Sequence, residues 1–167
     1  MTICVKKRIC LFGEIDNAKM ILNDAGTMIK KWYYEIENKF LDIKCFEMII
    51  MPNHFHCIIK NLGADLCVCP EKSLRDQRIL RDQRILGEHT GSPIHRVVQW
   101  FKTMTTNEYI RGVKNNNWQR FDGKLWQLNY WEQIIRNEKS YQTISEYVAN
   151  NPDKWNEDKL NPSKNII

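Results

Sequence analysis

The chain has 167 residues, a formal net charge of +5, and a composition that is 43% hydrophobic, 27% charged and 11% aromatic. A chain of this length and composition forms one domain with its own core, which excludes disordered, collagen-like and fibrous proteins. No apolar run approaches the roughly 18 residues of a membrane span, and charges interrupt the N-terminal MTICVKKRIC where a signal peptide would be apolar. We therefore expect a cytoplasmic protein with no membrane partner, whose six cysteines are reduced and mostly structural.

Apolar spacing and turn residues predict the elements of the first third of the chain. Residues 2–12 predict a strand, and a turn is expected over 13–17. A helix capped by Asn23 or Asp24 follows, because one helical face carries Ala25, Met28, Ile29, Trp32, Tyr33 and Ile36. Residues 46–51 and 55–59 predict two strands, or one strand broken by a turn at Pro52 and Asn53.

Residues 61–91 lack periodicity and contain the hexapeptide RDQRIL twice, at 75–80 and 81–86. We interpret them as a variable surface loop with a small duplication, the alternative being a basic arm that contacts nucleic acid. A helix then begins at Ser92 and Pro93 and is expected to stop at Gly112, with an apolar stripe of Ile94, Val97, Val98, Phe101 and Met104. A strand around 125–135 and a last helix from its cap Asn137 to Asn151 complete an α+β fold with helices packed on an antiparallel sheet.

Positive charge is concentrated in residues 95–124, which contain six Lys or Arg residues and only two acidic ones. The same segment carries the aromatic residues Trp100, Phe101, Tyr109, Trp118 and Phe121. Cations neutralise phosphates and aromatic rings stack on unpaired bases, so this segment is a candidate nucleic-acid surface. A solvated helix face over core aromatic residues is the alternative.

His54 and His56 form an HxH pair in the stretch MPNHFHC. On an extended chain both imidazoles point to one face, while Phe55 and Cys57 point to the other. Two imidazoles on one face can hold a metal ion, and a surface pair without metal is the alternative. No Cys4 or HExxH pattern accompanies the pair, so structural zinc and the common metalloprotease arrangement lack support.

Tyr147 and Asn151 stand out on the last predicted helix, NEKSYQTISEYVANNP. Tyr141, Ile144 and Val148 share one stripe, so Tyr141 is expected in the core. Tyr147 lies at the edge of that face, and Asn151 follows four residues later on the same side. A phenol that the core does not need, beside an amide, suits a nucleophile with a neighbouring metal ligand. A helix-edge Tyr before a helix-ending Asn is the alternative.

Taken together, the HxH pair and the later YxxxN resemble the pattern of HUH single-tyrosine DNA transposases. The chain is similar in particular to the REP-associated tyrosine transposases, within the insertion-sequence-200-like group. The matching stretches are IIMPNHFHCII, SPIHRVVQWFKTMTTNEYIRG and LWQLNYWEQIIRNEKSYQTISEYVANNP, in the family's order and over most of residues 10–155. The resemblance implies one transposase domain over residues 1–167 with a ferredoxin-like, RRM-like HUH nuclease fold.

The resemblance also implies roles for individual residues. Tyr147 would be the catalytic nucleophile, and His54, His56 and Asn151 would bind Mg²⁺ or Mn²⁺. The family cleaves and rejoins single-stranded DNA beside hairpins through a covalent 5′-phosphotyrosine and without ATP, which agrees with the absence of a GxxxxGK[ST] motif. Candidate phosphate contacts are His95, Arg96, Lys102, Arg111, Lys114 and Arg120. Candidate stacking residues are Trp118, Trp126 and Trp131, with packing roles expected for at least two of them.

The chain departs from the family's pattern in two places. Family members carry further residues ahead of the segment that matches MTICVKKRICLFGE, so the N-terminus is expected to be shortened. The RDQRIL duplication is the second departure. One rival hypothesis is a hairpin-DNA-binding regulator or relic that has lost catalysis. Another is a replication-initiator or relaxase-type nickase, which the helix-borne YxxxN and the short chain disfavour. Monomer and homodimer both remain open.

Overall fold

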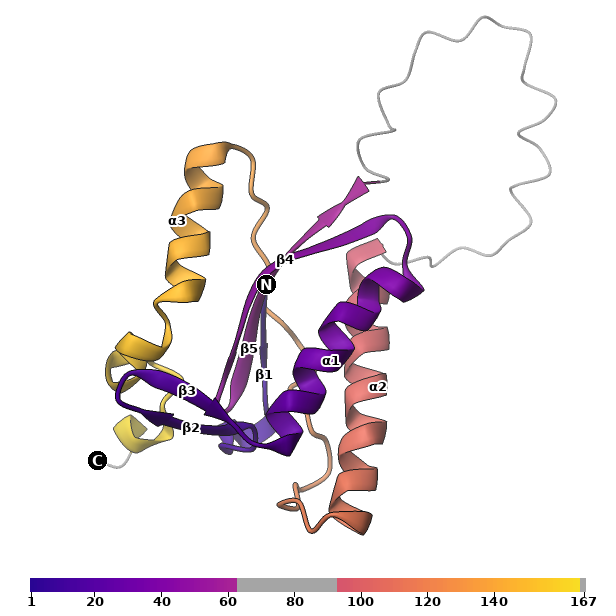
Figure 1. Ribbon diagram of the computed structural model, residues 1–167, viewed down its shortest axis with the longest axis vertical. Helices are drawn as coiled ribbons and strands as arrows, with labels where there is room; N and C mark the ends of the chain where they lie inside the picture. The colour runs from indigo at the N-terminus through magenta and orange to yellow at the C-terminus, as the bar shows by residue number, and fades with distance from the viewer. Residues whose placement is uncertain (63–92, 166–167) are drawn as a thin grey trace, which may run out of the picture.

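An antiparallel sheet with helices on both faces organises the chain (Figure 1). The computed structural model describes residues 1–62 and 93–165. The strands are β1 (Thr2–Cys4), β2 (Gly13–Asp16), β3 (Lys19–Leu22), β4 (Ile43–Met51) and β5 (His54–Asn61). The helices are α1 (Asp24–Lys39), α2 (Pro93–Asn115) and α3 (Glu138–Ala149), with short 3₁₀ turns η1 (Lys6–Arg8), η4 (Pro152–Glu157) and η5 (Pro162–Asn165). The predicted α+β class is confirmed.

The central sheet has the strand order β1-β5-β4, with every pair antiparallel. Residues 125–131 extend it past β1. Backbone hydrogen bonds join Thr2 and Trp131 in both directions, at 2.7 and 2.9 Å, and the Gln127 N–H donates to the Cys4 carbonyl at 2.9 Å. The strand expected over 125–135 is therefore present as an edge segment that pairs only as far as Trp131. With this segment counted, the element order and sheet order are compatible with a ferredoxin-like fold.

The two faces of the sheet have different partners. Helices α1 and α2 pack together on one face, and α3 covers the other (Figure 1). The core on the α1–α2 side centres on Phe55 of β5, whose ring lies 5.4 Å from that of Tyr33 and 5.3 Å from that of Phe101, measured between centroids. The Tyr33 hydroxyl contacts the carbonyls of Phe46 and Ile58 at 2.9 and 2.8 Å, so it ties α1 to both β4 and β5.

Helix α1 and the β4–β5 hairpin confirm the sequence expectations. The Asn23 side chain accepts a hydrogen bond from the Gly26 N–H at 2.9 Å and is the N-cap of α1. The chain turns at Pro52 and Asn53, so residues 43–61 form two strands and not one broken strand. Asn137 caps α3 by accepting from the Ser140 N–H, although α3 ends at Ala149, before the expected Asn151.

The N-terminal expectation of one strand over residues 2–12 is wrong beyond Cys4. The chain turns at η1, where Lys7 and Arg8 have positive φ angles of 61° and 55°. The following apolar residues, Leu11 and Phe12, are buried, but their N–H groups donate to the Pro52 carbonyl and to no neighbouring strand. Packing against the hairpin turn replaces strand pairing there.

The turn expected over 13–17 is also misplaced, because Gly13–Asp16 forms strand β2 paired with β3. The reversal occurs at Asn17 and Ala18, both with positive φ, at 46° and 60°. Asn tolerates this left-handed conformation better than most residues do, which favours a turn at Asn17 and Ala18, at the end of the range expected.

Gly112 does not end α2, which continues to Asn115. Its small size serves packing. A Cβ built at Gly112 would come within 2.2 Å of the Trp118 indole, because the chain folds back and lays that ring on the helix. The expected helix stop at Gly112 is therefore wrong, because the contact with Trp118 is what requires a glycine at this position.

Several sequence features fall outside the described residues, namely the RDQRIL copies, His89, Cys67 and Cys69. Ser92, the expected cap of α2, lies there as well. Within the described residues, Cys4, Cys10, Cys45 and Cys57 are free thiols, as expected. None of the described helices has the length and apolar character needed to cross a membrane.

Candidate functional site

The HxH pair lies on β5 and faces α3, as the period-two alternation of a strand predicts. Both imidazoles are buried, with His54 at 0% and His56 at 5% exposure, whereas the alternative interpretation was a surface pair. Their Nε2 atoms are 3.0 Å apart, and their rings are nearly perpendicular, at 80°. Phe55 and Cys57, on the opposite face, belong to the hydrophobic core and anchor the strand.

Asn53, in the turn before β5, fixes the orientation of His54. Its side-chain nitrogen donates to the carbonyls of Arg8 and Leu160, at 2.9 and 2.8 Å, which uses both N–H groups. Its Oδ1 therefore faces His54 Nδ1, 2.8 Å away, and must accept a hydrogen bond from it. The neutral His54 ring then carries its proton on Nδ1, so Nε2 presents a lone pair to His56.

Thr2 of β1 supports His56 in the same way. Its Oγ1 lies 2.8 Å from His56 Nδ1, and a hydroxyl can either donate or accept at this distance. If Thr2 donates, His56 can carry its proton on Nε2 and donate it to His54. If Thr2 accepts, both Nε2 lone pairs point into the same space, which is the state that a bound cation requires.

Burial keeps both imidazoles uncharged. Loss of solvent lowers the pKa of His54 from 6.5 to about 4, although the Asn151 side chain acts in the opposite direction. Loss of solvent, and then the neighbouring His54, lower the pKa of His56 to about 3. Near pH 7 the pair is therefore neutral, the protonation state of a metal-binding histidine.

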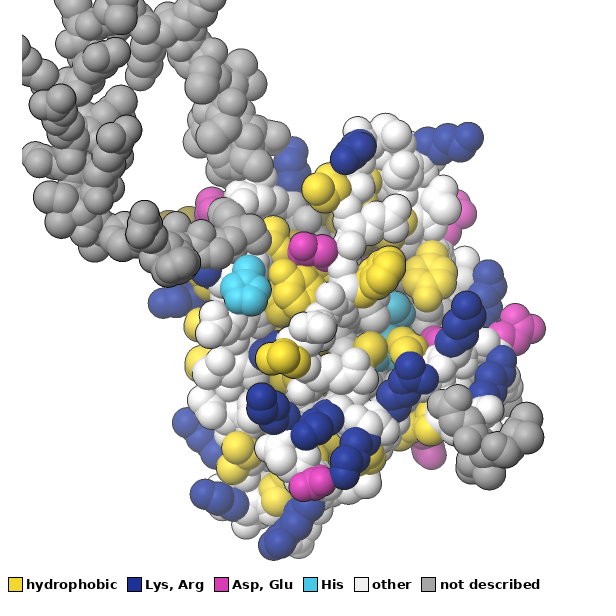
Figure 2. Space-filling model, turned by 180° about the vertical axis from the view of Figure 1, so that it is seen from behind, with side chains coloured by type: hydrophobic (Ala, Val, Ile, Leu, Met, Phe, Trp, Pro, Cys, Tyr) yellow, Lys and Arg dark blue, Asp and Glu magenta, His cyan; other side chains and the backbone are white. Residues whose placement is uncertain are grey.

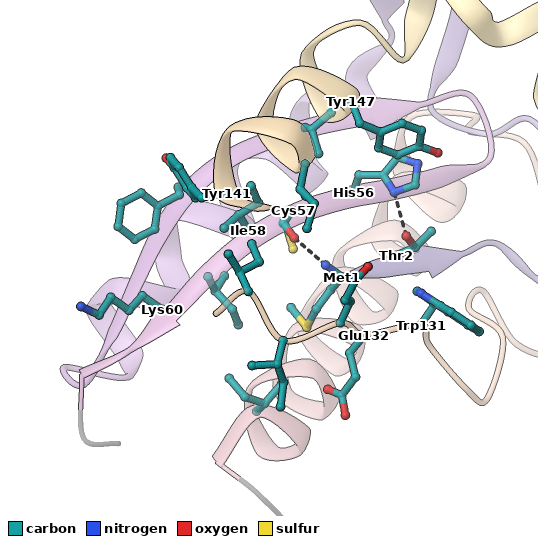
Figure 3. A pocket seen from close by; sticks show the side chains of 18 of the residues that line it. Met1, Thr2, His56, Cys57, Ile58, Lys60, Trp131, Glu132, Tyr141 and Tyr147 are labelled. Atoms are coloured by element: carbon teal, nitrogen blue, oxygen red, sulfur yellow. Dashed lines mark hydrogen bonds between the residues drawn. The ribbon is translucent and has the colours of Figure 1, made fainter. Parts of the chain in front are cut away.

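Tyr147 of α3 lies next to this pair. Its ring centroid is 5.5 Å from that of His56, the planes meet at 75°, and the residue is 50% exposed. Figure 3 shows Tyr147 over His56, with Tyr141 further along the helix. The expectation that Tyr141 belongs to the core is wrong, because it is partly exposed and its hydroxyl donates to the Glu47 carboxylate at 2.8 Å. That hydrogen bond raises the pKa of Tyr141.

Asn151 reaches the same site from the turn after α3. The helix ends at Ala149, and Asn151 starts η4 just before Pro152. The residue is only 3% exposed, yet its Oδ1 atom has no hydrogen-bond partner among the described residues. A buried amide oxygen without a partner is costly, and a cation or a donor group on a ligand would satisfy it.

Asp158 was not identified from the sequence. Its Oδ2 is 3.7 Å from His54 Nε2, and its side chain is 13% exposed. The same turn brings Trp155 to the pair, with its ring centroid 6.0 Å from that of His54. Within residues 1–62 and 93–165, no three His, Cys, Asp or Glu side chains form a ready-made metal site. The site is thus two histidines and an amide oxygen, with one carboxylate beside them.

A pocket of about 830 Å³ opens beside His56 and Tyr147 and runs between α3 and residues 131–135 (Figure 3). Its lining is mostly apolar and includes Trp131, which is 73% exposed. Trp126 is buried and Trp118 packs on Gly112, so these two residues have the packing roles expected for at least two of the three tryptophans. An exposed indole at the mouth of a pocket can stack on a planar ligand group.

The basic candidates are distributed unevenly. Figure 2 shows the molecule from the side opposite to that of Figure 1. On this face, most Lys and Arg side chains lie in the half that contains the C-terminal end of α2. The exposed candidates are His95, Arg96, Arg111, Lys114 and Arg120. Lys102 differs, because its ammonium donates to the carbonyls of Gln127 and Leu128, at 2.9 and 3.0 Å. It therefore fastens α2 to residues 127–128 and has few donors left for a phosphate.

Comparison with known proteins identifies a relative but no described family. The chain is 39% identical over 162 residues to an uncharacterized protein of Haemophilus influenzae, and the match covers 96% of this chain and 82% of the relative. No protein-family model and no solved structure matches the chain. An identity this high over nearly the whole chain shows common descent, so the chain belongs to the same protein family as this Haemophilus influenzae protein.

Proposed function

We propose that this protein is a metal-dependent HUH tyrosine transposase that cleaves and rejoins single-stranded DNA beside hairpin sequences in the bacterial cytoplasm. One observation carries the proposal. The Nε2 atoms of His54 and His56 lie 3.0 Å apart, and the ring of the half-exposed Tyr147 lies 5.5 Å from that of His56. A candidate nucleophile thus adjoins one member of a pair of neutral imidazoles, an arrangement that suits covalent phosphoryl transfer at a bound cation.

Of the two tyrosines on α3, Tyr147 suits the nucleophile better. The Tyr141 hydroxyl is held by Glu47, whose carboxylate raises the pKa of that phenol and so makes it harder to ionise. Tyr147 adjoins His56 and is open to solvent, where a DNA strand can reach it. The resemblance to single-tyrosine transposases selects the same residue.

The donor set fits a divalent cation. His54, His56 and Asn151 would hold Mg²⁺ or Mn²⁺, and the unpartnered Asn151 Oδ1 is the observation that favours a ligand there. Such a cation would polarise the scissile phosphate. The protein's own contribution is to orient the imidazoles, because Asn53 and Thr2 form hydrogen bonds with their Nδ1 atoms.

The proposed step balances without an external energy source. The Tyr147 oxygen loses its proton and forms a bond to the phosphorus, while the bond from phosphorus to the 3′ oxygen of the preceding nucleotide breaks. That oxygen takes up a proton and leaves as a free 3′-OH. Attack by a 3′-OH on the phosphotyrosine reverses the step and rejoins strands, so no ATP is consumed.

The surroundings supply a surface for the DNA. Unpaired bases can stack on Trp131 at the mouth of the pocket. Exposed cations of α2 and the following loop, such as Arg111 and Arg120, can neutralise phosphates.

An adduct assay with two matched tyrosine variants tests the proposal. Labelled single-stranded hairpin DNA and Mn²⁺ should give a denaturation-resistant protein–DNA adduct with the wild type and with Tyr141→Phe. The adduct should be absent with Tyr147→Phe and His56→Ala. Tight hairpin binding without an adduct in any variant would contradict the proposal and favour a DNA-binding regulator. An adduct that persists in Tyr147→Phe would overturn the choice of nucleophile.

A further inference from the structure

The 3₁₀ turn after α3 holds one carboxylate against the histidine pair. Asp158 Oδ1 accepts a hydrogen bond from the Leu160 N–H at 2.7 Å, which anchors that oxygen in the turn. The other oxygen, Oδ2, points to His54 Nε2 at 3.7 Å. Within the described residues, Asp158 supplies the one carboxylate within 4.0 Å of either imidazole of the pair.

The turn that carries Asp158 is fastened to the turn that carries the first histidine. The Leu160 carbonyl accepts from Asn53 Nδ2 at 2.8 Å, and the same Asn53 side chain accepts from His54. The Lys159 carbonyl accepts from Arg8 Nη1 at 2.9 Å. Because of these bonds, Asp158 is held in place with the imidazoles, and its approach to His54 is built into the fold.

The other candidate ligands are uncharged, so a divalent cation bound by them would be stabilised by a nearby carboxylate. The two imidazoles and the Asn151 amide carry no charge, and burying a divalent cation among uncharged groups is costly. Mg²⁺ and Mn²⁺ are hard cations that prefer oxygen ligands, carboxylates above all. Asp158 offers negative charge at this place.

The distances place Asp158 close to a position that shares the ion with the histidines. In an octahedral site with bonds near 2.1 Å, neighbouring ligand atoms lie about 3.0 Å apart and opposite ones about 4.2 Å apart. The two Nε2 atoms are 3.0 Å apart, as neighbouring ligands are, whereas the 3.7 Å from His54 Nε2 to Asp158 Oδ2 is longer than the distance between neighbouring ligands by about 0.7 Å. A small rotation of the carboxylate would bring Oδ2 into a position neighbouring His54.

We propose that Asp158 is a further ligand of the divalent cation and joins His54, His56 and Asn151 in a mixed nitrogen–oxygen set. This inference rests on the metal dependence of the proposed function. It assigns to the turn after α3 a direct part in holding the ion, beyond covering the histidines.

Calorimetric titration of the full chain with Mn²⁺ tests the inference without reference to activity. Asp158→Asn keeps an oxygen for the Leu160 N–H but removes the charge, so it should raise the Kd for Mn²⁺ at least about tenfold. Asp153→Asn, on the exposed start of the same turn, is the matched control and should leave the Kd unchanged. Thermal unfolding of the metal-free proteins checks that both variants fold.

A cysteine variant separates direct coordination from a general charge effect. With Co²⁺, Asp158→Cys should show a thiolate-to-cobalt charge-transfer band that is absent from the wild type and from Asp153→Cys. It should also favour Cd²⁺ over Mn²⁺, since thiolates select softer ions. If no band appears and Asp158→Asn binds Mn²⁺ like the wild type, while His54→Ala does not bind, this inference is wrong and the metal site stands. If the wild type binds no Mn²⁺, both this inference and the metal-dependent function are overturned.

Discussion

Asn53 accepts a hydrogen bond from His54 Nδ1 at 2.8 Å and thereby determines which nitrogen of the ring faces His56. The assignment holds because both N–H groups of the Asn53 amide are already used by the Arg8 and Leu160 carbonyls. One buried amide thus connects the N-terminal turn, the C-terminal turn and the histidine pair. The proposed metal site would therefore depend on a residue that does not touch the metal.

Asn53→Ala should therefore lower both stability and metal affinity. Two partly buried carbonyls lose their donor, so the free energy of unfolding should fall by roughly 2 kcal/mol. The Kd for Mn²⁺ should rise about tenfold, because His54 loses its fixed tautomer. Nitrogen-15 NMR of the imidazoles in the metal-free protein reads the tautomer directly. Asn38→Ala, at an exposed position on α1, is the control. A His54 ring that stays protonated on Nδ1 in Asn53→Ala would refute this account.

Because of Tyr33, the free energy of unfolding should fall as the pH rises into the alkaline range. Burial raises the pKa of its phenol far above the ordinary value of 10.0. The folded state holds this proton more tightly than the unfolded state, so the contribution is fully present below about pH 10 and is lost as the pH rises above it. Tyr33→Phe should lower the free energy of unfolding by about 1–3 kcal/mol near neutral pH, and should weaken its decline above pH 10. Urea unfolding at several pH values measures both effects. The exposed Tyr34→Phe should match the wild type, and equal pH dependence in Tyr33→Phe would exclude this role.

Gly112→Ala should destabilise the protein although Ala is the better helix former. Its Cβ would meet the Trp118 indole at 2.2 Å, which requires the ring or the helix to move. We expect a loss of about 1–3 kcal/mol, larger than the gain of up to about 1 kcal/mol in helix propensity. Urea unfolding beside the exposed control Asn107→Ala gives the comparison. A net gain in stability would show that Trp118 does not pack there.

Lys102 and Arg111 should behave differently toward DNA. Lys102 is engaged by backbone carbonyls, so Lys102→Gln should lower stability but leave the salt dependence of binding to single-stranded DNA unchanged. Arg111 is exposed on α2, and Arg111→Gln should reduce the slope of log K against log salt by about 0.7, the value for one phosphate on a single strand. Fluorescence anisotropy at several salt concentrations measures the slope, with Lys39→Gln on α1 as the control. The reverse pattern would mean that Lys102 contacts the phosphates.

Local patterns predicted those parts of the fold that local physics decides. The apolar spacing of α1, its Asn23 cap and the alternation that puts His54 and His56 on one face all depend on near neighbours in the chain. The role of Gly112 could not be predicted from its neighbours, because the residue that requires a glycine there is Trp118, whose ring folds back onto the helix from six positions later. The left-handed residues Lys7 and Arg8 likewise carry no local signal for a turn.

The candidate site was predictable where one element supplies it and not where a distant turn does. Tyr147 and Asn151 were found through their spacing to each other, and the structure places both near the histidines. Asp158 carries no motif that links it to His54, since only the folding of η4 across β5 brings them together. The burial of the histidine pair was missed for the same reason, because α3 and the C-terminal turn cover it.

Peptide mapping of the adduct shows whether Tyr147 forms the proposed covalent bond to DNA. A protease that cleaves after Glu residues cuts at Glu146, so Tyr141 and Tyr147 fall in separate peptides. The protein is first allowed to react with a single-stranded hairpin substrate and Mn²⁺, and the adduct is then digested with a nuclease. Mass spectrometry should find a nucleotide attached through its 5′-phosphate to the peptide that begins at Tyr147. A nucleotide on the peptide that contains Tyr141, or no modified peptide under conditions where the hairpin is bound, would show that Tyr147 is not the nucleophile.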